Sequence, residues 1–307
     1  MPIMHMSGGV PMDLALLEDF LELAREMNFS RAAANRNMTQ PAFSRRIRAL
    51  EDAMQTPLVT RTTRQVALTP AGAAFHPRAA AIIRQLADAR AEALETAGRA
   101  ARSLNLAATH ALSYTFIPRW LMQVADPAEF GALNMVSDTQ RQCLLLMQRA
   151  EASFFICHRG MSGAPILPER QFLSQVIGRD DLVPLSASDV SGRPRWRLGD
   201  AGAPVIAYGP ASGLHSIIDA HWARHGRPDM APAMSSILAA TNMEMAKAGH
   251  GIAFLPASLA EGDMQAGHLI QAGGPADHIP VEIAIYRPRS RLSPHGEAFW
   301  QKVLAWN

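Results

Sequence analysis

Hydrophobic residues near the N-terminus recur at three- and four-residue spacing, which predicts helices that share a small core. The first run predicts a helix over residues 13–27 whose apolar positions are Leu14, Leu17, Phe20, Leu21 and Ala24. Ser30 is expected to cap a second helix, and Thr39 a third helix with Pro41 in its first turn. The short turn between the last two helices is predicted at residues 36–38.

The third helix has two chemically different faces. Its inward face is formed by Phe43, Ile47 and Leu50, which leaves Pro41, Ser44, Arg45 and Arg48 on or near the outward face. Arginine pairs with guanine edges or phosphates, and an amide such as Gln40 at a helix N-terminus suits adenine or a phosphate. The spacing therefore predicts a helix-turn-helix that binds DNA.

Positive charge is concentrated in the same segment. Residues 28–64 contain seven arginines and two acidic residues, whereas the whole chain has a net charge of only +2. Neutralisation of phosphates by such a cluster releases counterions and favours DNA binding. The alternative is a solvated helix face on which arginines gather by chance.

Four stretches of this region resemble the N-terminal domain of LysR-type transcriptional regulators, namely residues 29–33, 39–47, 49–51 and 68–72. Two departures are Gln55, where the family usually has a glycine that ends the helix, and Val59, where it usually has phenylalanine. Gln55 implies a strained or longer helix end. The resemblance implies DNA contacts at Ser30, Arg31, Thr39, Gln40, Pro41, Ser44 and Arg45, with Arg48 and Arg61 nearer the phosphates.

Two short β-prone runs, residues 58–60 and 65–68, predict a hairpin whose tip carries Arg61 and Arg64. We interpret it as a wing that contacts the DNA backbone, with an ordinary surface hairpin as the alternative.

Downstream, Thr69 and Pro70 start another helix, and Pro77 is expected to divide a short turn from a long helix. That helix carries an apolar stripe at Ala79, Ile82, Ile83, Leu86, Ala89, Ala93 and Leu94.

The stripe predicts a partner helix from a second copy of the chain, in a dimer or homotetramer, as in the linker helix of the family. Packing against its own domain is the alternative.

Beyond residue 103, short apolar runs alternate with helical stretches, which is typical of α/β architecture. Residues 248–256 are the part of this region most similar to the two-lobed, periplasmic-binding-protein-like effector domain of the same family.

We therefore predict an α+β and α/β protein with a winged helix-turn-helix, a long linker helix and a two-lobed effector domain. The expected divisions are a disordered tail at 1–12, the DNA-binding domain at 13–69 and the linker at 70–102. The first effector subdomain is expected at 103–178 with 267–307, and the second at 179–266.

Two predicted strand-to-helix junctions bring hydroxyl groups to helix N-termini, where the helix dipole favours an anion. The candidate effector-binding residues are Thr109, Ser113, Ser212 and His215, and the expected ligand is a carboxylate or other small anion. The alternative for each hydroxyl is that it caps its own helix.

Oxidation of sulfur-containing residues is a second possible input signal for the regulator. Sixteen methionines, including Met243 and Met245, and two cysteines, Cys143 and Cys157, are candidate redox residues, and the chain also looks similar to the hypochlorite-responsive branch of LysR regulators. Core filling by methionine is the alternative. Two cysteines suit a reducing cytosol, and no signal peptide or membrane span is predicted.

No catalytic pattern emerges. Glycine motifs for nucleotides and a nucleophile elbow are absent, and His221 and His225 lack further ligands for a metal, so no enzyme, cofactor or metal is expected. The predicted partners are an operator in double-stranded DNA, the chain itself, a small-molecule effector and RNA polymerase. A two-lobed solute-binding protein and a small-molecule enzyme are the rival interpretations.

Overall fold

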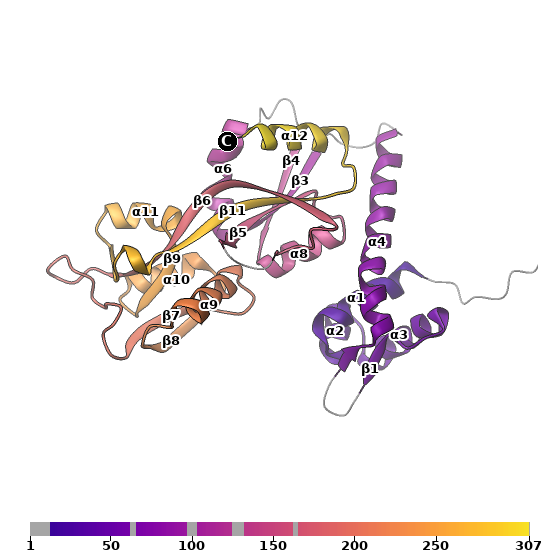
Figure 1. Ribbon diagram of the computed structural model, residues 1–307, viewed down its shortest axis with the longest axis horizontal. Coiled ribbons are helices and arrows are strands. Elements are labelled where there is room, and N and C mark those ends of the chain that lie inside the picture. Colours follow the sequence, from indigo (N-terminus) through magenta and orange to yellow (C-terminus); the bar gives the residue numbers. More distant parts are fainter. Residues whose placement is uncertain (1–12, 62–65, 97–102, 125–131, 162–164, 307) are drawn as a thin grey trace, which may run out of the picture. The chain divides into compact units, whose positions relative to one another are not determined.

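The computed structural model describes residues 13–61, 66–96, 103–124, 132–161 and 165–306, which fold into two compact units (Figure 1). The first unit comprises residues 1–93 with 148–150, and the second comprises 94–147 with 151–307. The predicted tail at 1–12 lies outside the described residues. Within the described part of the chain, no helix is both long and apolar enough to cross a membrane.

Three helices build the N-terminal unit: α1 (Leu14–Glu26), α2 (Phe29–Asn35) and α3 (Gln40–Met54). Their shared core contains Phe20, Leu23, Phe43, Ile47 and Leu50, all fully buried. The inward face predicted for the third helix is therefore confirmed. The periodicity succeeds here because each helix buries one apolar stripe against the other two.

The capping residues are partly as predicted. Thr39 caps α3, since its Oγ1 accepts a hydrogen bond from the Ala42 amide at 3.4 Å. The cap of α2 is Asn28 and not Ser30, because the Asn28 side chain accepts from the Arg31 amide at 3.0 Å. At the end of α3, Gln55 adopts a left-handed conformation with φ of 54°, which is the strained helix end that the missing glycine predicted.

A two-stranded hairpin follows, in which β1 (Val59–Arg61) pairs antiparallel with β2 (Val66–Leu68). The predicted wing strands are confirmed, while the tip with Arg64, and the side chain of Arg61, lie outside the described residues.

Helix α4 (Pro70–Thr96) is continuous, so the prediction that Pro77 divides it is wrong. Pro77 is exposed. Its ring costs one internal hydrogen bond, and the helix continues through it.

The apolar stripe of α4 serves two purposes. Ala79 and Ile83 are buried in the core of the N-terminal unit, as the alternative interpretation held. Ile82 and Leu86 are 41% and 53% exposed, and Ala89 and Ala93 are exposed as well. Among the stripe residues whose side chains the structure describes, this second set is available to a partner helix, and the side chain of Leu94 lies outside the described residues.

A buried carboxylate ties the three helices together. Asp19 of α1 is fully buried and accepts hydrogen bonds from Arg36 Nε, at 2.7 Å, and from Arg46 Nε. Arg36 also pairs with Glu18 at 2.6 Å, and Arg31 Nε lies 3.3 Å from Glu26 Oε2. Three of the seven arginines in the basic segment are thus paired with acids of α1, which lie upstream of that segment.

The C-terminal unit is built on one sheet. Its strands are β3 (Ser103–Thr109), β4 (Ala132–Asp138), β5 (Phe154–Gly160), β6 (Phe172–Ala187), β7 (Ala203–Tyr208), β8 (Met230–Ser236), β9 (Ile252–Pro256), β10 (Leu269–Gln271) and β11 (Ile279–Pro288). Their order is β4-β3-β5-β11-β6-β9-β7-β8, and β10 pairs with β6. The long antiparallel pair of β6 and β11 runs through the middle of the sheet (Figure 1).

The sheet has two halves that share β6 and β11. The first half contains β3, β4 and β5 with the adjoining residues of β6 and β11. The second half contains β7, β8, β9 and β10 with the remaining residues of β6 and β11. Helices α5 (His110–Tyr114), α6 (Ile117–Val124) and α12 (Pro294–Ala305) cover one face of the first half, and α8 (Gln140–Gln148) covers the other. Helix α9 (Gly213–His225) covers one face of the second half, with α10 (Ala239–Lys247) and α11 (Ala257–Gln265) on the other. A short 3-10 helix, η1 (Pro275–Asp277), precedes β11.

Two strands differ from the sequence-based expectation. Strand β6 is longer than its apolar run at residues 182–185 indicates, because the strand continues through Arg179, Asp180 and Asp181, which interrupt the apolar pattern. Strand β8 was not predicted, since it contains Pro232 and is mostly exposed at the edge of the sheet.

Candidate functional site

The outward side of α3 presents a set of mostly polar side chains that we call the reading face, formed by Gln40, Pro41, Ser44, Arg45 and Arg48. All but the partly buried Ser44 are exposed. Arg45 and Arg48 form no ion pair with any residue that the structure describes. Arg46, which lies between them in the sequence, forms an ion pair with Asp19. The reading face therefore keeps two guanidinium groups for an external anion.

The preceding helix adds a second set of exposed groups. Ser30 and Arg31 are exposed at the start of α2, and Thr39 is exposed at the cap of α3. Arg31 is anchored, because its Nη2 also donates to the Glu26 carbonyl oxygen at 2.9 Å. Asn37, at φ of 55°, makes the left-handed turn that orients α3 after α2. A helix with free arginines behind a sharp turn can enter the major groove of a duplex.

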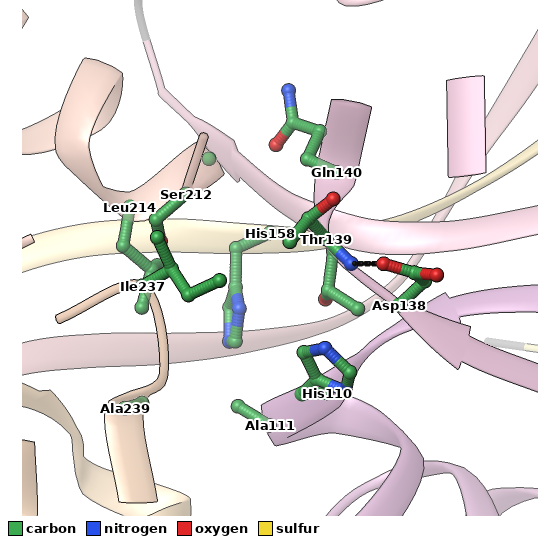
Figure 2. Close-up of a pocket in the computed structure, with 12 residues that line it drawn as sticks. His110, Ala111, Asp138, Thr139, Gln140, His158, Ser212, Leu214, Ile237 and Ala239 are labelled. Carbon is green, nitrogen blue, oxygen red and sulfur yellow. Dashed lines mark hydrogen bonds between the residues drawn. The ribbon is translucent and has the colours of Figure 1, made fainter. Parts of the chain in front are cut away.

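The second candidate site is a cavity of about 410 Å³ between the two halves of the C-terminal unit, which we call the cleft cavity (Figure 2). Its lining residues come from the strand ends and helix starts of both halves: Thr109, His110, Ala111, Asp138, Thr139, Gln140, His158, Ser212, Gly213, Leu214, Ile237 and Ala239. In the first half these residues end or follow β3 and β4, and His158 lies two residues before the end of β5. Ligands of α/β sheets bind at such carboxyl ends.

Two of the four predicted effector residues line the cleft cavity. Thr109 and Ser212 precede α5 and α9, and neither side chain caps its helix. The Thr109 Oγ1 atom is buried and has no hydrogen-bond partner among the described residues. A buried hydroxyl without a partner costs free energy, which a ligand that hydrogen-bonds to it would recover.

The other two predicted residues do not line the cleft cavity. Ser113 Oγ donates to the His110 carbonyl oxygen at 2.8 Å and lies 2.8 Å from Ser137 Oγ. His215 uses Nδ1 on the Tyr208 carbonyl oxygen at 2.8 Å, and its Nε2 lies 3.1 Å from Asp219 Oδ2. Both side chains are therefore occupied within the fold.

His158 is a lining residue that the sequence analysis missed. It is only 4% exposed, and its Nε2 lies 3.7 Å from Asp180 Oδ2, beyond hydrogen-bonding distance. Burial opposes the ionisation of Asp180, but His158 and the hydroxyl of Ser258, at 2.6 Å, bring the pKa of that carboxyl below its usual value. The polar residue at the end of the buried run 154–157 was the available signal.

The charge of the cleft cavity does not match a strongly anionic ligand. No lysine or arginine is among its lining residues, and Asp138 contributes a carboxylate that accepts from the Thr139 amide at 2.6 Å. The dipoles of the helix starts are the electropositive feature that remains at this site. Hydrogen bonding is thus the main means of recognition that this site offers.

The redox candidates have unequal environments. Cys143 and Cys157 are fully buried, and burial raises the pKa of the Cys143 thiol to about 12 and that of Cys157 further. Since the thiolate is the reactive form, neither cysteine is suited to oxidation. Met243 and Met245 of α10 are half-buried against the core of the second half, together with Met234 and Met264.

The two histidines of α9 do not form a metal site in this structure. Their rings stack with centroids 4.3 Å apart, and His225 Nδ1 lies 3.0 Å from the His221 carbonyl oxygen. Within the described ranges, no group of three or more potential metal ligands was found.

Comparison with known families matches almost the whole chain. Residues 14–73 match the family described as "Bacterial regulatory helix-turn-helix protein, lysR family", and residues 97–307 match the "LysR substrate binding domain". The HTH-type transcriptional regulator YjiE of Escherichia coli K12 is 30% identical over 287 residues, which cover 94% of this chain and 92% of the relative.

Solved structures of similar proteins have the same architecture. Vibrio fischeri DarR, in complex with DNA, is 26% identical with a TM-score of 0.56, covering 97% of this chain and 100% of that one. Salmonella typhimurium HypT is described as a hypochlorite-specific LysR-type transcriptional regulator. It is 27% identical with a TM-score of 0.57, and the match covers 96% of this chain and 98% of HypT. The predicted function as a DNA-binding regulator with an effector-binding domain is confirmed, and the enzyme and solute-binding interpretations are wrong. The chain belongs to the LysR family of transcriptional regulators.

Proposed function

We propose that this regulator recognises its operator through the reading face of α3, with Arg45 and Arg48 as its principal cations. The supporting observation is the division of the arginines. Arg31, Arg36 and Arg46 are held by acids of α1, whereas Arg45 and Arg48 are exposed and unpaired among the described residues. An unpaired exposed guanidinium can bind a guanine edge without first breaking an ion pair.

The remaining predicted contacts fit this arrangement. Gln40, Pro41 and Ser44 lie on the same face, and Ser30, Arg31 and Thr39 lie at the two helix starts that precede it. We assign Arg61 and Arg64 of the wing to backbone phosphates. Because operator DNA is in the cytoplasm of a bacterial cell, the regulator is proposed to act there.

The input to this regulator is proposed to be a small molecule that binds in the cleft cavity. Thr109, Ser212 and His158 line it from both halves of the sheet, and at least two of their polar atoms lack partners among the described residues. A ligand that bonds to both halves favours the arrangement in which they are close together. An anionic ligand, as the sequence analysis expected, would be favoured by the dipoles of the helices that start after Thr109 and Ser212.

Assembly is proposed to involve the exposed part of the α4 stripe. Ile82, Leu86, Ala89 and Ala93 are spaced by three or four residues, so they form one apolar side of the helix. Such a side is stabilised when a second helix covers it, and the symmetric partner is the α4 of another copy. The resulting dimer would present two reading faces to the two halves of a palindromic operator.

Oxidation of methionine is a second candidate input. The observation in its favour is the group of four methionines that pack against one core in the second half. Conversion of a thioether to a sulfoxide places a polar group against apolar neighbours such as Leu255 and Ala246. The resemblance to HypT, described as hypochlorite-specific, is consistent with this input.

Arg45→Ala should weaken operator binding by about 1 to 3 kcal/mol and relax the sequence preference, because a guanidinium is lost from the reading face. The measurement is a fluorescence-anisotropy titration with operator DNA isolated by genomic selection. Arg78→Ala, which removes an exposed arginine from α4, is the matched control and should leave affinity within about 0.5 kcal/mol. Equal affinities for the two variants would contradict the assignment of the reading face.

Leu86→Glu should produce smaller assemblies, since a carboxylate placed in an apolar helix contact has no partner there. Multi-angle light scattering measures the mass in solution. The matched control is Gln85→Glu, which adds the same charge at the neighbouring exposed position and should keep the wild-type mass. A wild-type mass for Leu86→Glu would remove α4 from the proposed interface.

Thr109→Val and Ser212→Ala should each weaken effector binding by about 2- to 10-fold while leaving operator binding without effector intact, because each removes one hydroxyl from the cleft cavity. Effectors are first identified by a thermal-shift screen of metabolites and then titrated calorimetrically. Ser113→Ala, at a serine that does not line the cavity, is the control and should behave like wild type. If only Ser113→Ala lost effector binding, the effector would bind outside the cleft cavity.

Hypochlorous acid should change operator affinity, and the change should persist after the oxidant is removed if methionine is the sensor. The double variant Met243→Leu with Met245→Leu keeps the apolar volume and should abolish this response. Met122→Leu, which replaces an 85% exposed methionine, should not. A full response in the double variant would exclude these two residues as the sensor.

A further inference from the structure

A close contact joins the two halves of the C-terminal unit across the cleft cavity. Gln140 is the first residue of α8, in the first half, and Gly213 is the first residue of α9, in the second half. Both residues line the cleft cavity (Figure 2). A Cβ atom at Gly213 would lie 1.7 Å from Gln140 Oε1 and 2.7 Å from Gln140 Cδ. The Gln140 carboxamide therefore lies directly against the glycine backbone, and any larger residue at position 213 would displace it.

The two helices that meet at this contact start differently. Helix α8 has a cap, because Thr139 Oγ1 accepts a hydrogen bond from the Gln142 amide at 3.3 Å. Before α9, Ser212 has the extended backbone conformation of an N-cap, but its side chain accepts no capping hydrogen bond. The first N–H groups of a helix require acceptors, and the helix dipole makes this end electropositive. The start of α9 is thus a position that favours an acceptor oxygen.

Gln140 brings such an oxygen from the other half of the sheet. A carboxamide oxygen is an acceptor, and Gln140 Oε1 lies at the first residue of α9 because Gly213 has no side chain to exclude it. The same cavity is lined by His158, which is only 4% exposed and whose Nε2 has no hydrogen-bond partner among the described residues. A buried polar atom without a partner indicates that the cavity receives a ligand, and Gln140 lies where that ligand would meet α9.

We propose that Gln140 is an intramolecular competitor of the effector. Its carboxamide covers the N-terminus of α9 when no effector is bound, and an acceptor oxygen of the effector takes its place. This inference rests on the proposed function of the cleft cavity as the effector site. Displacement of Gln140 breaks a contact between α8 and α9, so effector binding also changes how the two halves are held together. Gln140 accordingly lowers effector affinity, and a shorter side chain at this position raises it.

The contact is tested by thermal unfolding of the full-length protein without effector. Gly213→Ala should lower the melting temperature by about 2 to 4 °C, because its methyl group has to displace the carboxamide. The same substitution should cost little in a Gln140→Ala background, since the colliding atoms are gone. The difference between the two costs measures the coupling of the two residues. An equal cost of Gly213→Ala in both backgrounds would overturn the proposal.

Two variants are controls for this cycle. Gly262→Ala makes the same change in α11, where a Cβ atom meets nothing within 4 Å, and it should not lower the melting temperature. Gln142→Ala removes an exposed glutamine from the first turn of α8 and should leave the cost of Gly213→Ala unchanged. If Gln142→Ala relieved that cost as fully as Gln140→Ala does, the contact would not be specific to Gln140 and the proposal would fail.

Competition at α9 is tested with two small probes, acetamide and acetate. Acetamide has the carboxamide that Gln140→Ala lacks, and acetate has a charged acceptor in its place. In saturation-transfer NMR titrations, at least one probe should bind Gln140→Ala about 5-fold more tightly than wild type, which corresponds to about one hydrogen bond. Gln142→Ala should bind both probes like wild type. Equal affinities of Gln140→Ala and wild type for both probes would overturn the proposal.

The effector itself separates this proposal from the proposed effector site. Its affinity should rise about 5-fold in Gln140→Ala and fall in Thr109→Val and Ser212→Ala. If it falls in those two variants and stays at the wild-type value in Gln140→Ala, competition by Gln140 is overturned while the effector site stands. If it is unchanged in Thr109→Val and Ser212→Ala, the effector site is refuted, and competition with it, even where Gln140 and Gly213 are coupled.

Discussion

The pairing of β6 with β11 is the constraint on which the C-terminal unit depends. The two strands are hydrogen-bonded from the Phe172–Pro288 pair to the Leu182–Ile279 pair, so they belong to both halves of the sheet. Ile177 and Ile285 enter the core of the first half, whereas Leu182 and Ile279 enter a core of the second. A register shift between Ile283 and Ala284 marks an irregularity in the pair. Bulges bend and twist strands locally, so this irregularity shapes the strand pair that the two halves share.

The N-terminal unit depends in a similar way on Asp19. This carboxylate is fully buried beneath Arg36 and Arg46, which come from the turn after α2 and from α3. Removal of one partner from a buried ion pair is strongly destabilising, so the pair fixes the angle between the helices. The same carboxylate pairs with Arg36 and Arg46, so these two arginines are not available to bind DNA. The exposed charge of the reading face is therefore smaller than the composition of residues 28–64 suggests.

Much of the N-terminal fold could be predicted because its signals are local. Periodic apolar residues, the Thr39 cap and the turn at Asn37 act over a few residues along the chain. The partners of the arginines could not be predicted in this way, since Arg46 and Asp19 are brought together only when the helices pack. The choice of Asn28 over Ser30 as a cap has a similar cause: both are capping residue types, and the register of α2 decides between them.

The cleft cavity was predictable only in part. Thr109 and Ser212 stand directly before helices, and that position is visible in the sequence. Ser113 is one turn further on, where its hydroxyl bonds to the His110 carbonyl oxygen, and His215 turns to Tyr208 and Asp219. Sequence spacing does not fix those side-chain directions. For His158 the only local signal was a polar residue directly after the buried apolar run 154–157 of β5, and that signal does not show which cavity the side chain lines.

Strand β5 carries polar residues on both faces of the sheet. Consecutive residues of a strand point to opposite faces, so His158 lines the cleft cavity while Arg159 points to the other face. Both residues have acidic partners on the central strands: Asp180 of β6 for His158 and Glu282 of β11 for Arg159. An effector in the cleft cavity that moved His158 away from Asp180 would therefore act on the strand pair that joins the two halves.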